Sequence, residues 1–383
     1  MTATAVADRA AQQFRAWHGV APEGVWHAPG RVNLIGEHTD YNSGWVLPFA
    51  LDRGVVVAAA RRDDGVLDIR SLQEPGRQAS LPLAGLTPGS VAGWAAYPAG
   101  VAWAMREAGH PVGGASLVID SDLPQGAGLS SSAAIECAVA IALADLSGVR
   151  VPRGELVRLA QRAEDEMAGV PSGIMDQSAS LFGQPGHALL LDCRTREAVQ
   201  VPFGPAAAGL ALLVVDTRAR HALTDGRYAL RRQECERAAR ALGLASLRDV
   251  ADPAQAAAIA DPVLARRARH VVSDNCRVRA AAALLRAHDP AGLGPLLHAS
   301  HASLRDDFEV SWPQADVAAE MAEQAGALGA RMVGGGFGGS VIALVPADDA
   351  AVRAAVRARY AGRGWAPPRF LAAPPSAGAR RVL

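Results

Sequence analysis

Apolar residues recur along this chain with two different spacings, which predict alternating helices and strands. Helix spacing predicts an amphipathic helix over residues 3–18 and another over 91–108, whose apolar positions include Trp94 and Val101. Short apolar runs bounded by Gly, Asp or Pro predict strands. The predicted strands are 45–51, 55–61, 66–71, 115–120, 187–192, 210–217, 340–345 and 369–373. Further helices are predicted at 133–146, 153–168, 313–327 and 348–361. A short helix that residues 172–177 open is predicted to end at Phe182, and several helices are predicted within 224–306.

This alternation runs through both halves of the chain and favours an α+β or α/β fold. The length of 383 residues suits about two or three domains. Residues 203–209 carry Gly and Pro and are the best candidate for a boundary. The sequence therefore predicts one domain over 1–203 and a second over 204–383.

Composition narrows the possible partners and location. Hydrophobic residues make up 50% and charged residues 20%, as in a folded protein. The formal net charge is zero, so no nucleic-acid or acidic-membrane partner is expected. The four cysteines lie far apart, no apolar run is long enough to cross a bilayer, and residues 1–14 lack an apolar signal core. We expect a cytoplasmic protein.

The chain contains no lysine, and all 38 basic residues are arginine. A Walker P-loop and a protein kinase each require a lysine at the phosphates. Schiff-base and pyridoxal phosphate chemistry require a lysine amine. If the protein handles phosphate, it must do so with arginine, backbone N–H groups and a metal.

One stretch combines a strand, a turn and a helix start, and we call residues 124–134 (PQGAGLSSSAA) the Gly/Ser loop. Its glycines let the backbone approach a ligand, and its serines supply hydroxyls where a new helix has unpaired N–H groups. Such a site suits an anion, most often a phosphate. The plainer alternative is a capped helix after a turn.

Residues 30–42 (GRVNLIGEHTDYN), which we call the signature segment, hold several polar groups in a short space. Glu37, His38 and Asp40 could together bind the hydroxyls of one polyol, since carboxylates accept and imidazole donates or accepts. Arg31 could neutralise a phosphate or hold a carboxylate. A solvated turn is the alternative.

Two further carboxylates could have a role in catalysis. Glu164 lies in a predicted helix with other acidic residues, and a magnesium nucleotide commonly takes one or two protein carboxylates. Asp176 follows Gly173 in a turn and could accept or orient a hydroxyl proton. Solvent exposure is the alternative for Glu164 and helix capping for Asp176. The scattered histidines show no zinc-binding spacing.

The glycine-rich loop, residues 334–339 (GGGFGG), satisfies the G-x-G-x-x-G pattern of a dinucleotide site. That pattern requires a following helix, whereas residues 340–345 (SVIALV) predict a strand. A dehydrogenase is therefore not favoured. The loop more plausibly approaches a ligand bound elsewhere.

Together, these stretches resemble the galactokinase branch of the GHMP small-molecule kinases. The signature segment is similar to the highly specific galactokinase signature, the Gly/Ser loop to the nucleotide-phosphate loop, and residues 334–340 to the third motif. Residues 161–177 are also similar. The resemblance runs from about residue 8 onward. It implies an α+β, two-domain GHMP kinase architecture, with an N-terminal domain like part of a ribosomal protein, a ferredoxin-like C-terminal domain and the site between them.

The resemblance also implies roles for individual residues. Asp176 matches the catalytic base near the sugar C1 hydroxyl, and Arg31 the cation that keeps Asp176 ionised and stabilises the transferring phosphate. Tyr228, which composition alone would place in a core contact, matches a sugar-binding position in a looser segment. The implied substrate-binding residues are Glu37, His38, Thr39, Asp40, Gly173, Asp176 and Tyr228.

For the nucleotide, the resemblance implies that the backbone from Gly126 to Ser132 surrounds the ATP phosphates and that Ser132 and Glu164 bind magnesium. Ser131 is close enough to Ser132 that either serine could be the ligand. The implied nucleotide-binding residues are Ser71, Gly126, Ala127, Gly128, Leu129, Ser130, Ser131 and Ser132.

The expected activity is ATP-dependent phosphorylation of α-D-galactose at its C1 hydroxyl, with ATP and Mg²⁺, by a monomer without nucleic-acid or membrane partners. One alternative is a kinase for a related sugar such as N-acetylgalactosamine. A second is a non-catalytic regulator that binds galactose and ATP. Retention of Arg31, Asp176, Ser132 and Glu164 disfavours the regulator.

Overall fold

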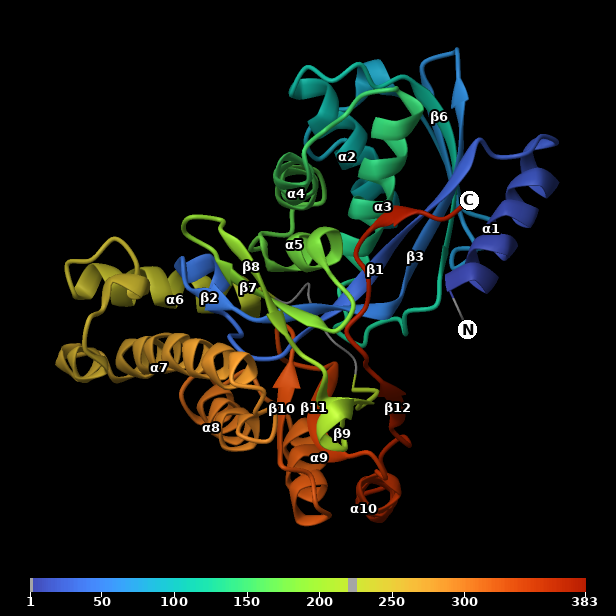
Figure 1. Cartoon of the computed structure of the whole chain (residues 1–383). Helices are drawn as coiled ribbons and strands as arrows, with labels where there is room; N and C mark the ends of the chain where they lie inside the picture. Colours follow the sequence, from blue (N-terminus) through green and yellow to red (C-terminus); the bar gives the residue numbers. More distant parts are fainter. Residues whose placement is uncertain (1–2, 220–225) are drawn as a thin grey trace.

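The computed structural model describes residues 3–219 and 226–383, and within these residues the strands form three sheets (Figure 1). The largest sheet belongs mainly to the first half of the chain and has the order β13-β1-β3-β6-β4-β5. Its neighbours are antiparallel except β4 and β6, which run parallel. Its strands are β1 (Gly24–Asn33), β3 (Pro48–Arg62), β4 (Val66–Ser71), β5 (Gln78–Pro82), β6 (Gly114–Ser121) and β13 (Arg380–Arg381).

Helices cover both faces of this sheet (Figure 1). On one face α1 (Ala3–His18) buries a stripe that includes Val6, Ala10 and Phe14 against β1, β3 and β6. Strand β6 is almost fully buried, because both of its faces are covered. On the opposite face α3 (Ser131–Leu146) and α5 (Met175–Phe182) contact β1 and β3, and α2 (Ala96–Glu107) and α4 (Arg153–Arg162) pack beside these helices.

The second half of the chain is built around an antiparallel sheet with the order β10-β11-β9-β12. One face packs against α9 and α10, whereas Val333, Ile342 and Leu344 on the other face join the core of the first half. A third sheet has the order β2-β7-β8. The remaining elements are β2 (Trp45–Val46), β7 (His187–Asp192), β8 (Ala198–Pro202), β9 (Leu210–Asp216), β10 (Gly329–Val333), β11 (Ser340–Pro346), β12 (Arg369–Ala372), α6 (Arg227–Ala241), α7 (Pro262–Arg286), α8 (Leu293–Asp306), α9 (Pro313–Gln324) and α10 (Ala350–Gly362).

The end of the chain returns to the first sheet. Strand β13 pairs with β1, with Trp26 opposite Arg381, and the N–H of Ser376 donates to the carbonyl of Ala50 at 2.8 Å. The last residues therefore stabilise the sheet of the first half. The division of the chain into 1–203 and 204–383 stays a prediction.

Most of the predicted elements are confirmed, several with the same bounds, as for 3–18 and 187–192. Two predictions were wrong in detail. The strands predicted at 45–51 and 55–61 place a break at residues 52–54, but the break lies at Leu47, between β2 and β3. Strand β3 runs without a break through Gly54, whose N–H donates to Asp122 at 2.9 Å. The predicted helix 153–168 is α-helical only to Arg162 and continues as one π-helical turn, Ala163–Met167. Strands β1, β5, β8, β10 and β13 were not predicted.

Residues 224 and 225 of the predicted helical stretch 224–306 lie outside the described residues. Among the helices that the structure describes, none has both the length and the apolarity that a membrane span requires.

Candidate active site

The Gly/Ser loop follows β6, an inner strand of the six-stranded sheet, and leads into α3. Gly126 and Gly128 have φ angles of 71° and 72°, which glycine adopts without strain. Ser130 has a φ of 58° although it carries a side chain, which disfavours this region. Helix α3 begins at Ser131, so its first N–H groups lack partners within the helix. This geometry suits an anion, as the sequence predicted.

Arg31 and Asp176 form a bidentate ion pair beside this loop. The guanidinium donates from Nε to Oδ1 and from Nη2 to Oδ2, each at 2.7 Å, and from Nη1 to the Gly128 carbonyl at 2.8 Å. The Ser130 hydroxyl donates to the same carboxylate. Arg31 is 5% exposed and the Asp176 side chain 26%. The carboxylate is thus fixed on one side and open to a ligand on the other.

The local folds explain how these groups meet. Arg31 follows an irregularity in the pairing of β1 with β3, between Pro29 and Arg31. Asp176 lies in the first turn of α5, where the helix dipole favours a carboxylate. Burial lowers the pKa of Arg31, but the charges of Asp176 and Glu37 outweigh it and hold that pKa above its ordinary value.

An aromatic cluster surrounds His38. Its Nδ1 lies 2.9 Å from the Tyr41 hydroxyl, and its ring centroid lies 5.4 Å from that of Tyr228 and 4.8 Å from that of Phe308. Burial, together with the charges of His270 and Arg231, holds the pKa of His38 well below its ordinary value. The imidazole is therefore neutral near pH 7. The structure brings Tyr228 to the signature segment despite the loose motif around it.

Asp40 and Gly173 are in close contact. A methyl group at position 173 would overlap the Asp40 carboxylate. Burial, followed by the charge of Asp176, raises the pKa of Asp40 to about 7. Only glycine at position 173 leaves room for this carboxylate.

We therefore expect Gly173→Ala to raise the Kd for sugar by ~10- to 100-fold while the ATP affinity stays unchanged, because the added methyl group displaces Asp40. Titration calorimetry with each ligand measures both effects. Gly154→Ala is the matched control, since a Cβ there meets open space. Equal sugar affinities for Gly173→Ala and wild type would contradict the role of this contact.

Glu164 lies in the π-helical turn and faces α3 and α5. Gln177 donates from Nε2 to Glu164 at 2.8 Å and to Glu136 at 3.0 Å, and all three side chains are buried. Burial and the charge of Asp176 raise the pKa of Glu164 to about 7, against hydrogen bonds from Ser132, Ser172 and Gln177. A π-helical turn is often found at a functional site.

A magnesium ion fits these donors. Among residues 3–219 and 226–383 no group of three or more His, Cys, Asp or Glu could hold a metal on its own. Magnesium bound to a nucleotide needs only one or two protein ligands, with phosphates and waters completing its shell. The Glu164 carboxylate and the Ser132 hydroxyl, which acts to lower the pKa of Glu164, offer such a pair of hard oxygen ligands.

The raised pKa values of Asp40 and Glu164 predict a pH-dependent stability. Both groups hold a proton in the folded protein at pH values where the unfolded chain has lost it. Their contribution is full below about pH 4 and is lost as the pH rises through about 7, at a cost of roughly 1–3 kcal/mol. Urea unfolding of the ligand-free protein at pH 5 to 8 should show this fall. Asp40→Asn should make the fall in unfolding free energy with pH less steep, whereas Asp63→Asn, at an exposed position, should not change it. An unchanged slope in Asp40→Asn would contradict the contribution of Asp40.

Two of the predicted site residues make hydrogen bonds within the protein. The Thr39 side chain is fully buried, and its hydroxyl lies 2.8 Å and 2.7 Å from the carbonyls of Gly36 and Trp45. Its single O–H proton can serve only one of these carbonyls at a time, and the oxygen is shielded from solvent. Ser71 ends β4 beside β6, and its hydroxyl accepts from the Gln73 N–H at 3.2 Å.

The glycine-rich loop packs against the Gly/Ser loop. The Ser340 hydroxyl donates to the Ala127 carbonyl at 2.7 Å, and a Cβ on Gly334 would lie 3.3 Å from the Gly128 carbonyl. The Gly334 N–H also donates to Glu37 at 2.9 Å. The loop thus joins the two other motifs, and its glycines permit this close approach.

Sequence reasoning missed Arg331, Gln177 and Glu136. Gln177 directly follows Asp176 within residues 161–177, which resemble the kinase family, so its position was a usable signal. Arg331 precedes the glycine-rich loop by three residues, but nothing in its surroundings distinguishes it from the many other arginines.

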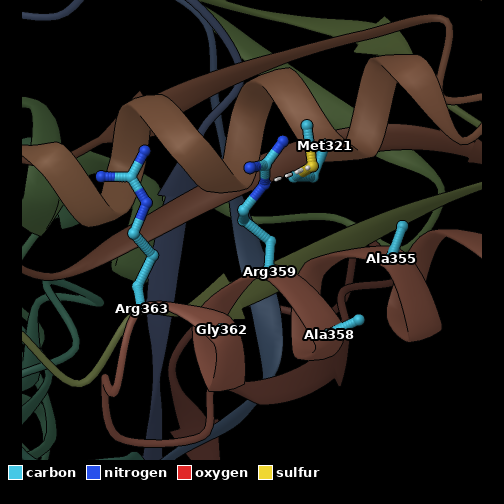
Figure 2. A pocket seen from close by; sticks show the side chains of 6 residues that line it. All are labelled: Met321, Ala355, Ala358, Arg359, Gly362 and Arg363. Carbon is cyan, nitrogen blue, oxygen red and sulfur yellow. Dashed lines mark hydrogen bonds between the residues drawn. The ribbon is translucent and has the colours of Figure 1, made fainter.

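The concave surface shown in Figure 2 lies apart from these motifs. It has a volume of about 410 Å³ and is lined by residues of α9, α10 and the turn after it. Arg359 donates there to the sulfur of Met321 at 3.3 Å. Its lining residues are Met321, Ala355, Ala358, Arg359, Gly362 and Arg363, and none belongs to the candidate site.

Known proteins share both the motifs and the fold. Residues 12–61 match the galactokinase galactose-binding signature, 96–184 the GHMP kinases N terminal domain and 281–362 the GHMP kinases C terminal domain. The galactokinase of Streptomyces coelicolor is 49% identical over 99% of both chains. That of Mycobacterium tuberculosis is 53% identical over 87% of this chain and 93% of its own.

The chain belongs to the galactokinase family of GHMP kinases. The structure of Lactococcus lactis galactokinase complexed with galactose superposes with a TM-score of 0.92, at 36% identity and over 98% of this chain and 99% of that one. The galactokinase signature match includes Arg31 to Asp40, and the N terminal domain match includes the Gly/Ser loop, Glu164 and Asp176. The two-domain GHMP kinase fold expected from the sequence is confirmed.

Proposed function

We propose that this chain transfers the γ-phosphoryl group of ATP to the C1 hydroxyl of galactose, giving galactose 1-phosphate and ADP. The single observation that carries the proposal is the Arg31–Asp176 pair, in which Arg31 of the signature segment also donates to the Gly/Ser loop. A kinase needs a group that takes the hydroxyl proton next to a group that holds the phosphate. The identity to galactokinases over the whole chain supports galactose as the acceptor.

Asp176 accepts the proton of the C1 hydroxyl on its open side, while Arg31 and Ser130 fix its orientation. The same guanidinium lies next to the Gly/Ser loop and stabilises the negative charge of the phosphoryl group in transfer. Phosphoryl transfer depends mainly on such alignment and charge stabilisation.

The Gly/Ser loop binds the ATP phosphates through backbone N–H groups. Ser132 and Glu164 hold Mg²⁺, which supplies positive charge to the phosphate oxygens when it is bound. Ser132 is half-buried and acts to lower the pKa of Glu164, whereas Ser131 is exposed, which favours Ser132 as the second ligand.

The sugar binds between Glu37, His38, Asp40, Gly173 and Tyr228. The neutral imidazole of His38 and the carboxylates offer donors and acceptors for sugar hydroxyls. We further propose a cytoplasmic monomer with domains at 1–203 and 204–383, and a Ser71 contact with the nucleotide.

A panel of sugars separates this function from its rivals. We expect kcat/KM in an ADP-release assay to be largest for galactose and lower by at least ~100-fold for N-acetylgalactosamine. A larger value for N-acetylgalactosamine would assign the chain to a related sugar kinase. Tight binding of galactose and ATP without turnover would identify a regulator instead.

A further inference from the structure

Arg331 is a buried cation for which the proposed chemistry has no role. It lies on β10 and is fully buried. The neighbouring Ala330 and Met332 face the core formed with α9, whereas Val333, on the same side as Arg331, faces the first half of the chain. The guanidinium therefore reaches from the second half into the first.

There it meets the signature segment at three points. Nη1 donates to the carbonyls of Asn33 and Leu34 at 2.9 Å and 3.1 Å, and Nη2 pairs with Oε1 of Glu37 at 3.1 Å. The two carbonyls lie where β1 ends, just before the chain turns at Gly36. One side chain thus fixes both the exit from β1 and the carboxylate beyond it.

Two other groups from the second half hold Glu37. The Gly334 N–H donates to the same Oε1 at 2.9 Å, and His270 Nε2 donates to the Glu37 main-chain carbonyl at 3.1 Å. Within the described residues these contacts all use Oε1 or the main chain, so Oε2 is left to accept a hydrogen bond from a ligand.

We propose that Arg331 is a positioning residue for sugar binding, which holds Glu37 so that its second oxygen meets a sugar hydroxyl. This rests on the proposed function, in which Glu37 binds the sugar. Without the guanidinium, the buried Glu37 carboxylate would lose its ion-pair partner and keep only the Gly334 N–H, and two buried carbonyls would lose their donor. Glu37 would then turn toward other partners or solvent, and sugar affinity would fall.

The test combines variants of both residues. Arg331→Met and Glu37→Gln should each raise the Kd for galactose by ~10- to 100-fold, while the Kd for ATP stays within about 3-fold of wild type. The double variant should bind galactose no more weakly than the weaker single variant, because both changes remove the same contact. Arg331→Lys keeps the charge and should bind galactose more tightly than Arg331→Met.

A control variant separates positioning from stability. His301 accepts from the Met332 N–H at 3.2 Å, so it supports the same strand but does not touch Glu37. His301→Ala should lower the Tm and leave the Kd for galactose within about 3-fold. Galactose binding and Tm are measured by calorimetry on the purified full chain.

Each outcome decides the proposal. A galactose Kd for Arg331→Met near wild type, or losses that add in the double variant, would overturn it while leaving the proposed function intact. An unchanged Kd in Glu37→Gln would overturn it by removing Glu37 from the sugar site. If Arg331→Met does not fold, Arg331→Gln, which removes the charge, decides: a rise in Kd that disappears in the Glu37→Gln background supports the proposal, and an unchanged Kd overturns it.

Discussion

Replacing Asp176 by Asn should lower kcat by at least ~1,000-fold while ATP still binds. An amide cannot take the proton of the sugar hydroxyl, and it leaves the Arg31 guanidinium with only one acceptor oxygen at this position. The Gly/Ser loop keeps its backbone, so the Kd for ATP should stay within about 5-fold. An ADP-release assay measures the first effect and calorimetry the second.

Asp145→Asn provides the matched control, because Asp145 is a carboxylate that accepts from the Trp26 indole at 2.6 Å away from the site. Its kcat should match the wild-type value. A near-wild-type kcat for Asp176→Asn would remove Asp176 from the chemistry. A loss of ATP binding as large as the loss of rate would show instead that its carboxylate mainly supports the loop.

Replacing Arg31 by Lys should lower kcat/KM by ~100- to 10,000-fold, although the charge is kept. Arg31 makes three hydrogen bonds from a buried position, to both oxygens of Asp176 and to the Gly128 carbonyl. An ammonium group is a point charge on a flexible stem and cannot reproduce this planar arrangement. Asp176 or the loop would then lose its fixed position.

Steady-state kinetics of Arg31→Lys measure this loss. Arg53→Lys is the control, since Arg53 pairs with Asp122 at a longer 3.6 Å and lies outside the motifs. It should keep the wild-type kcat/KM. A kcat/KM for Arg31→Lys within about 5-fold of wild type would mean that the positive charge alone suffices for catalysis and that the bidentate hydrogen bonds are not needed.

The sequence predicted the helices and apolar strands because their hydrophobic spacing is local. It did not predict β5, whose residues alternate at a sheet edge, or β13, which pairs with a strand more than 350 residues earlier. The π-helical turn that carries Glu164 was also missed, because its composition is that of an ordinary helix. Pairing and helix type depend on contacts that the local pattern does not contain.

The candidate site followed from motifs, and the structure brings most of its residues together. Arg31, Gly128, Ser130 and Asp176 meet although they lie up to 145 residues apart. The motifs did not reveal Arg331, because its burial and its contact with Glu37 depend on the tertiary structure.

Phosphorus NMR of the reaction product tests the proposed chemistry most directly. With galactose, ATP and Mg²⁺, the wild-type chain should form one phosphorus signal coupled to the anomeric proton of galactose, and Asp176→Asn should form none. Phosphate on another hydroxyl, or ADP formed at the same rate without galactose, would contradict the transfer to C1 that we propose.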